Sequence, residues 1–220
     1  MGGGENVSLE TFERLPADRR EGILSAGIRE FSGKSYKDVR MEDITEACRI
    51  SKGILFHYFG SKKEFYLYCL ESALARLTER TEPVTGEGFY GVLFAAMDRK
   101  IALCRRYENE TRMANMASRD VSGEILREKA ELLRRYADAV QTESALTLRR
   151  ALEALGPENP PRPLAAAGLQ IYVSALLNRY LLAYQQDPDG FFLNAADMKR
   201  ELREYLDLML FGICGKGGSS

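Results

Sequence analysis

Residues Arg40–Phe65 read RMEDITEACRISKGILFHYFGSKKEF, and they predict two short helices joined by a tight turn, with a further helix starting directly afterwards. Ile44 and Ala47 give the first of these helices an apolar face. The segment Cys48-Arg49-Ile50 forms the turn, in which the isoleucine is expected to point toward the core. Two short helices separated by such a turn have the layout of a helix-turn-helix.

The second helix of this stretch keeps one side for the core. Ser51 has the side-chain oxygen of a helix N-cap, and Leu55 and Phe59, four residues apart, return to the core. The residues between them form a basic and aromatic set that points away from the core: Lys52, Gly53, Ile54, Phe56, His57 and Tyr58. Because the major groove of B-DNA admits an α-helix, this set favours DNA binding.

The chain as a whole has the composition of an ordinary globular protein. Its 220 residues are 45% hydrophobic and 29% charged, with a formal net charge of -1. No apolar run approaches the roughly 18 residues of a membrane-spanning helix, and the N-terminus lacks the basic start and apolar core of a signal peptide. We therefore expect a cytoplasmic protein with no membrane partner.

Positive charge is concentrated toward the N-terminal end. Residues 14–66 hold 11 Lys and Arg against 8 Asp and Glu, whereas residues 67–220 hold 20 against 21. This modest difference is compatible with ordinary surface scatter. It also agrees with a nucleic-acid contact near the N-terminus, because phosphate contacts supply most non-specific affinity.

Motifs of metal binding and catalysis are missing from the sequence. The four cysteines are scattered without a CxxC pair and the chain has a single histidine, so neither a zinc site nor a disulfide framework is expected. No Ser/His/Asp set, Gly-rich phosphate loop or HExxH motif indicates an enzyme. We expect no catalytic residue, no metal and no cofactor.

Apolar residues recur at helical spacing along most of the chain, and strand-like alternation is nowhere sustained. The predicted fold class is all-α, with about nine helices. Short helices come first and long helices follow. The predicted organisation is a flexible N-terminal segment at 1–15, a helix-turn-helix domain at 16–64, a second helical domain at 65–214 and a flexible tail at 215–220.

This layout resembles the TetR/AcrR family of one-component transcriptional regulators. The resemblance covers about residues 20–66, and the rest of the chain matches only in the number and lengths of its helices. The matching residues are Ile23-Leu24-Ser25-Ala26, Phe31, Tyr36, Asp43-Ile44, Ala47, Ser51-Lys52-Gly53, Leu55-Phe56-His57-Tyr58-Phe59 and Ser61-Lys62. The resemblance implies a homodimer that reads a near-palindromic operator in double-stranded DNA, with residues 65–214 binding an effector and forming the dimer.

Three positions depart from the usual family pattern. Arg49 stands where the family usually has Gly, and a left-handed conformation there costs a non-glycine residue about 1–2 kcal/mol. Arg40 stands where Ser or Thr commonly caps the helix, and because a basic side chain cannot accept from its N–H groups, Asp38 or Asp43 is expected to substitute in part. Ser35 replaces the usual Gly. Arg40 and Arg49 are thus expected to alter operator preference.

The resemblance also assigns the DNA contacts. Lys62, Tyr58 and His57 are expected to hold phosphates, Lys62 because the first turn of a helix attracts anions. The candidates for reading bases are Lys52, Ile54 and Phe56, with Arg40 and Met41 at the start of the preceding helix.

Several of these positions also have a simpler explanation. A helical Gly costs about 0.8–1 kcal/mol against Ala, so Gly53 indicates a close approach, either of DNA or of a neighbouring helix. Ile54 suits a thymine methyl group or an incidental surface position. Tyr58 suits a phosphate contact or a half-buried core position, and His57 would carry little meaning outside this motif.

The last two predicted helices carry more apolar residues than one face of a monomer can bury. We expect a four-helix interface between two copies, as in the family, or alternatively a broad core within one copy. The interface candidates are Leu169, Val173, Leu176, Leu177, Tyr180, Leu206, Met209, Leu210 and Ile213.

An effector pocket is expected among methionine and aromatic residues, which suit adaptable apolar sites but more often form plain core. The pocket candidates are Met97, Met113, Met116, Leu133, Tyr136 and Tyr172, with Arg112, Asn115, Gln170 and Asn178 as polar candidates. Such a set suits a lipophilic or aromatic organic molecule.

The sequence thus predicts a ligand-responsive DNA-binding regulator, by default a repressor that a small organic effector releases from a palindromic operator. The alternative is an all-α module that binds a small molecule or lipid and does not bind DNA. Specific, salt-sensitive binding to DNA separates the two.

Overall fold

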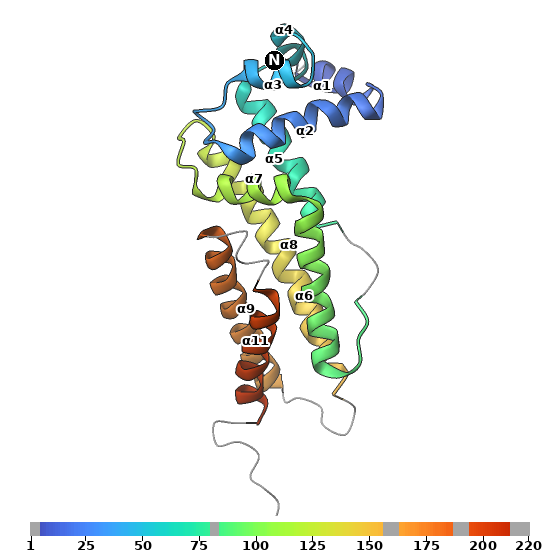
Figure 1. Ribbon diagram of the computed structural model, residues 1–220, viewed down its shortest axis with the longest axis vertical. Helices are drawn as coiled ribbons and strands as arrows, with labels where there is room; N and C mark the ends of the chain where they lie inside the picture. The colour runs from blue at the N-terminus through green and yellow to red at the C-terminus, as the bar shows by residue number, and fades with distance from the viewer. Residues whose placement is uncertain (1–4, 80–83, 156–162, 187–193, 212–220) are drawn as a thin grey trace, which may run out of the picture. The chain divides into compact units, whose positions relative to one another are not determined.

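The computed structural model of the protein describes residues 5–79, 84–155, 163–186 and 194–211. Over these residues the chain is all-α, as predicted, with ten helices and no strand. The helices are α1 (Glu5–Glu13), α2 (Ala17–Gly33), α3 (Met41–Ala47), α4 (Lys52–Phe59), α5 (Lys62–Leu77), α6 (Gly88–Arg106), α7 (Glu108–Arg119), α8 (Leu126–Glu153), α9 (Pro163–Gln186) and α11 (Ala195–Phe211) (Figure 1). None of the described helices is long and apolar enough to cross a membrane.

Helix α1 corrects the prediction that residues 1–15 form a flexible segment. Residues 5–13 are helical, and Phe12 is 1% exposed. Leu9 and Phe12, three residues apart, share one side of the helix and reach the core formed by the helices that follow. Two apolar residues are too few to produce a periodic pattern, so the sequence gives no sign of this helix.

The first compact unit is formed by the described residues up to 79 and by residues 103–138. It contains α1 to α5, α7 and the start of α8, and α7 packs across α2 and α5. Its largest fully buried side chains are Phe12, Ile23, Ile28, Phe31, Ile44, Leu55, Phe65, Leu70, Met113 and Ile125. The helix-turn-helix therefore shares one core with α5 and α7.

Helices α2 and α5 approach closely at Gly27. A Cβ atom on Gly27 would lie 2.6 Å from Cζ of Phe65 and 2.7 Å from Sγ of Cys69. A larger residue at position 27 would therefore force the side chains of Phe65 and Cys69 to shift.

The predicted domain boundary after residue 64 falls inside this first unit. Helix α5 lies wholly within it, and Phe65, Leu70 and Ala73 are buried in its core. Residues 108–138, placed in the second domain by the prediction, also belong to the first unit. The short helices α3 and α4 offer small apolar faces, and α5 and α7 supply the surface that covers a core of this size.

The second unit contains residues 84–102 and the described residues from 139 onward, so α6 and α8 contribute to both units. Its buried residues come from α6, α8, α9 and α11: Phe89, Val92, Leu93, Leu148, Ala151, Leu152, Leu169, Val173, Leu176, Tyr180, Met198, Leu202 and Leu206.

Most of the described dimer-interface candidates are buried in this core instead of lying at the surface. Those that are at most 8% exposed within one chain are Leu169, Val173, Leu176, Tyr180 and Leu206. They pack in one cluster with residues of α6 and α8, so the broad core within one copy holds for them. Met209 is 47% exposed, whereas the side chains of Leu177 and Leu210, and all of Ile213, lie outside the described residues.

Candidate nucleic-acid interface

The helix-turn-helix consists of α3, a turn at residues 48–50 and α4, which we call the recognition helix. Arg49 has a φ of 54°, the only positive φ of a non-glycine residue among those described, so it adopts the left-handed conformation whose cost is given above. The N–H of Ile50 donates to the carbonyl of Thr45 at 3.0 Å and closes the turn. An arginine in this position carries a cost of about 1–2 kcal/mol that glycine avoids.

Serine side chains cap the two helices after the turn. The Oγ of Ser51 accepts from the N–H of Ile54 at 3.2 Å, which confirms the predicted N-cap of α4. The Oγ of Ser61 accepts from the N–H of Glu64 at 3.1 Å and starts α5. Each cap satisfies a helix N–H group that would otherwise need water.

The N-terminus of α3 has no side-chain cap, and neither expected substitute supplies one. Asp43 lies 3.9 Å from Arg40 and 3.4 Å from Lys34 in ion pairs, and Asp38 accepts from Ser35. The side chain of Arg40 is 72% exposed. It can therefore reach an external partner, as the sequence predicts.

Two predicted DNA contacts instead lie against the chain's own atoms. Met41 is 5% exposed and belongs to the first core, so it cannot read a base. The Nζ of Lys62 donates to the carbonyls of Val39 at 2.6 Å and Lys37 at 3.4 Å, and it lies 4.7 Å from the ring centre of Tyr36. Burial lowers the pKa of Lys62. This ammonium holds the loop before α3 rather than a phosphate.

The outward face of the recognition helix carries the exposed residues Lys52, Gly53, Ile54 and His57. Ile54 is 43% exposed. Among the described atoms, only the Oγ of Ser51, at 3.8 Å, would come near a Cβ on Gly53. Close packing of a neighbouring helix therefore does not explain this glycine.

Lys52 is held at the surface by two neighbours. Its Nζ lies 2.7 Å from Oε1 of Glu42 and 5.7 Å from the ring centre of Phe56. The hydrogen bond from Lys52 lowers the pKa of Glu42. Both side chains of this ion pair are about half exposed, and exposed pairs are weak, so a phosphate or base edge can replace Glu42.

Phe56 and Tyr58 are half-buried and pack against the first core. The ring centre of Tyr58 lies 5.6 Å from that of Phe12 and 5.9 Å from that of His57. The half-buried position expected as the simpler explanation for Tyr58 is therefore the one its ring occupies.

The sequence prediction missed the polar contacts that hold the loop before α3. The N–H of Tyr36 donates to Oδ2 of Asp120 at 2.6 Å, and the Tyr36 hydroxyl donates to Glu124 at 3.0 Å. Burial alone would raise the pKa of Asp120, but hydrogen bonds from Ser122 and from the Tyr36 amide hold it below its ordinary value. Asp120 lies 84 residues from Tyr36, so no local pattern indicates the pairing.

The predicted effector-pocket residues are divided between the two compact units. The first unit contains Met113, Met116, Leu133 and Tyr136, and the second contains Met97 and Tyr172. Met113 is fully buried, with Leu133 and Tyr136 packed against the same core, while Met97 and Tyr172 pack against the second core. Plain core, the alternative left open above, describes Met113 best.

Asn115 on α7 differs from the other polar candidates. Its Oδ1 is the only buried side-chain nitrogen or oxygen among the described residues that has no hydrogen-bond partner. Arg112 and Gln170 bond to neighbours on their own helices, and the side chain of Asn178 lies outside the described residues. A buried acceptor without a hydrogen bond destabilises the fold. A bound molecule that donates a hydrogen bond to Oδ1 of Asn115 would remove this cost and would therefore bind favourably.

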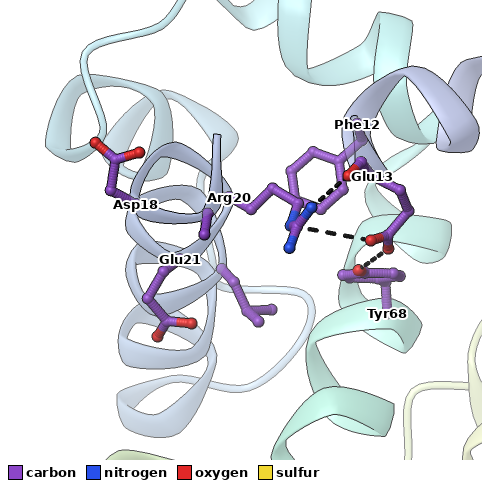
Figure 2. A pocket seen from close by; sticks show the side chains of 8 residues that line it. Phe12, Glu13, Asp18, Arg20, Glu21 and Tyr68 are labelled. Carbon is purple, nitrogen blue, oxygen red and sulfur yellow. Dashed lines mark hydrogen bonds and ion pairs between the residues drawn. The ribbon is translucent and has the colours of Figure 1, made fainter. Parts of the chain in front are cut away.

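An open surface hollow of about 600 Å³ lies on the first unit (Figure 2). It is lined by Phe12, Glu13, Ala17, Asp18, Arg20, Glu21, Leu24 and Tyr68, which come from α1, α2 and α5. None of these residues is among the predicted pocket candidates.

Comparison with known proteins gives matches to the N-terminal part of the chain. Residues 23–69 match the family described as "Bacterial regulatory proteins, tetR family". The transcriptional activator FasR of Mycolicibacterium smegmatis is 37% identical over 59 residues, 26% of this chain and 27% of FasR. The transcriptional repressor AcnR of Corynebacterium efficiens is 30% identical over 73 residues, 33% of this chain and 38% of AcnR. The chain thus matches well under two thirds of the length of these relatives.

A solved structure resembles the chain over most of its length. It is a TetR family transcriptional regulator from Chloroflexus aurantiacus, with a TM-score of 0.54 and 20% identity, and the match covers 91% of this chain and 95% of that one. At this identity the similarity concerns the fold alone.

Proposed function

We propose that the chain, in which residues 23–69 match the tetR family of bacterial regulatory proteins, is a transcriptional regulator whose recognition helix enters the major groove of DNA. The observation that carries this proposal is the outward face of α4. Lys52, Ile54 and His57 are exposed there, and Gly53 leaves open space for a close approach. This face reads bases, and Arg40 beside it contacts the DNA backbone or a base.

The chain acts as a homodimer on a near-palindromic operator. Two recognition helices about 34–36 Å apart match one turn of DNA and give the affinity that one short helix lacks. Exposed apolar side chains in the second unit support such a pairing, because Ile171 is 72%, Leu208 49% and Met209 47% exposed. These residues replace the five buried candidates as the expected contact between copies.

A small organic effector releases the protein from DNA, which makes it a repressor. The support for an effector is the buried, unpaired Oδ1 of Asn115, which suits a ligand that carries a hydrogen-bond donor on an apolar body. Release requires the effector to favour one arrangement of the dimer over the other by about 1–3 kcal/mol.

The test is selection of duplexes from a randomised DNA pool by the purified full-length chain, followed by fluorescence anisotropy. We expect an inverted repeat with half-site centres about 10 base pairs apart. Its affinity should exceed that of a scrambled duplex by about 10³-fold or more and fall steeply with salt. Asn115→Leu should leave DNA affinity unchanged and weaken the response to organic ligands found by thermal shift.

A pool without any enriched sequence would contradict the proposal. Binding of small organic molecules or lipids by such a chain would then support the alternative, an all-α module that does not bind DNA.

A further inference from the structure

Helix α1 packs against the recognition helix, although it lies outside the segment that matches the tetR family. Its nine residues, ENVSLETFE, contain three glutamates and no lysine or arginine. Such a helix repels phosphates instead of binding them. Any favourable effect of α1 on DNA binding is therefore expected to pass through the helices that it touches.

Phe12 makes the contact between the two helices. Its side chain is 1% exposed, and its ring centre lies 4.8 Å from that of Phe59 and 5.6 Å from that of Tyr58, both on α4. The ring of Tyr68 on α5 meets Phe12 edge-on at 5.5 Å. One side chain of α1 thus joins the C-terminal turn of the recognition helix to α5.

Glu13 supplies the second attachment of α1 (Figure 2). Its carboxylate accepts a hydrogen bond from the hydroxyl of Tyr68, and its backbone carbonyl accepts one from Arg20. The open hollow described above lies next to these contacts, so α1 is not packed tightly against α2 and α5 there. The attachment of α1 to α2 and α5 therefore depends on few side chains, which makes single substitutions informative.

We propose that α1 is a positioning element for the recognition helix and that Phe12 is its positioning residue. By holding Tyr58 and Phe59, Phe12 sets the orientation in which α4 presents Lys52 and His57 to DNA. The consequence for DNA affinity rests on the proposed function, whereas the effect on α4 itself does not.

The test compares full-length Phe12→Ala, Phe12→Leu and a control, Phe31→Ala. Phe31 is equally buried, but its ring packs against Phe65 and Tyr66 of α5. Amide hydrogen exchange is measured at Leu55 and Gly60, whose N–H groups bond within α4 and at its end, and at amides of α2 and α5. Anisotropy with the selected duplex follows at a temperature where each variant is folded.

We expect Phe12→Ala to speed exchange in α4 by about ten-fold or more, with α2 and α5 little changed, and to weaken DNA binding by about ten-fold. Phe12→Leu should retain most of the exchange protection of α4 and most of the DNA affinity. Phe31→Ala should not speed exchange in α4 selectively. Unchanged exchange in α4, or an equal change in α2, α4 and α5, would overturn the proposal. If the wild-type chain binds no specific duplex, the proposed function fails, and the exchange data still decide the role of α1.

Discussion

Asp120, in the turn between α7 and α8, accepts a hydrogen bond from the backbone N–H of Tyr36 at 2.6 Å. The carboxylate is 8% exposed, and its other oxygen accepts from the N–H of Ser122 at 2.8 Å. Lys129 donates to the carbonyls of Ala117 and Asp120 and orders the same turn. The turn thus holds the loop that leads into the helix-turn-helix.

Removing this carboxylate should destabilise the first unit. Asp120→Ala leaves the buried amide of Tyr36 without an acceptor, so we expect the free energy of unfolding to fall by about 1–3 kcal/mol. Urea denaturation followed by circular dichroism measures it. Asp138→Ala, which removes an exposed carboxylate from α8, is the control and should change little; equal losses in both would contradict the assignment.

The same carboxylate should make the fold sensitive to acid. Since the pKa of Asp120 is lowered in the folded chain, its ionised form stabilises the fold above its unfolded pKa, about 3.9. That stabilisation is lost as pH falls through the lower folded pKa. The measurement is the urea denaturation midpoint between about pH 7 and about pH 3. As the pH falls, this midpoint should decline less for Asp120→Asn than for wild type. Parallel declines would show that this group does not contribute.

Gly53→Ala should change stability and DNA binding in opposite directions. A Cβ at this exposed helical position would lie 3.8 Å from the Oγ of Ser51, an ordinary contact without a clash, so replacing the glycine should stabilise the fold by about 0.5–1 kcal/mol. The added methyl group should obstruct DNA and lower operator affinity. Gly22→Ala on α2, also exposed with nothing within 4 Å, is the matched control. It should gain stability and keep its affinity; an affinity loss in both would refute a specific role for Gly53.

Lys62 and Lys52 should respond differently to alanine. The ammonium of Lys62 bonds to backbone carbonyls, so Lys62→Ala should lower the free energy of unfolding by about 1–2 kcal/mol. Lys52→Ala should leave the free energy of unfolding nearly unchanged, because its exposed ion pair with Glu42 is weak. It should relax the preference for the operator sequence, because Lys52 is a proposed base-reading residue. The measurements are denaturation and anisotropy across salt concentrations. If Lys62→Ala leaves the free energy of unfolding unchanged and reduces the salt dependence of DNA affinity by about one phosphate contact, the predicted contact of Lys62 with a phosphate would be supported.

Arg49→Gly should relieve the strained turn. At a φ of 54°, glycine avoids about 1–2 kcal/mol and gives back about 0.5–1 kcal/mol of chain entropy, so a gain of up to about 1.5 kcal/mol is expected. Arg49→Ala keeps the strain and should gain little. Thermal denaturation of the two variants separates backbone strain from loss of the arginine side chain; equal midpoints would remove the strain argument.

The longest helices follow from the sequence because their apolar stripes repeat over many turns. Such stripes run through α6 (Gly88–Arg106) and α8 (Leu126–Glu153), which lie in the part of the chain predicted to hold long helices. Helix α1 was missed because Leu9 and Phe12 give only one turn of pattern, and their partners on α4 and α5 lie more than 40 residues away. Met41 was placed on the DNA side because a short helix offers too few residues to tell its two faces apart.

Features that depend on neighbours within one helical turn can be predicted from the amino-acid sequence alone. The Ser51 cap and the apolar spacing of α4 are both local, since each involves residues at most four positions apart. The hydrogen bonds of Lys62 to Val39 and of Asp120 to Tyr36 depend on the packing of the folded chain, because these partners lie 23 and 84 residues away. Such pairings depend on how the helices pack, and packing is the sum of many contacts that no short stretch of sequence contains.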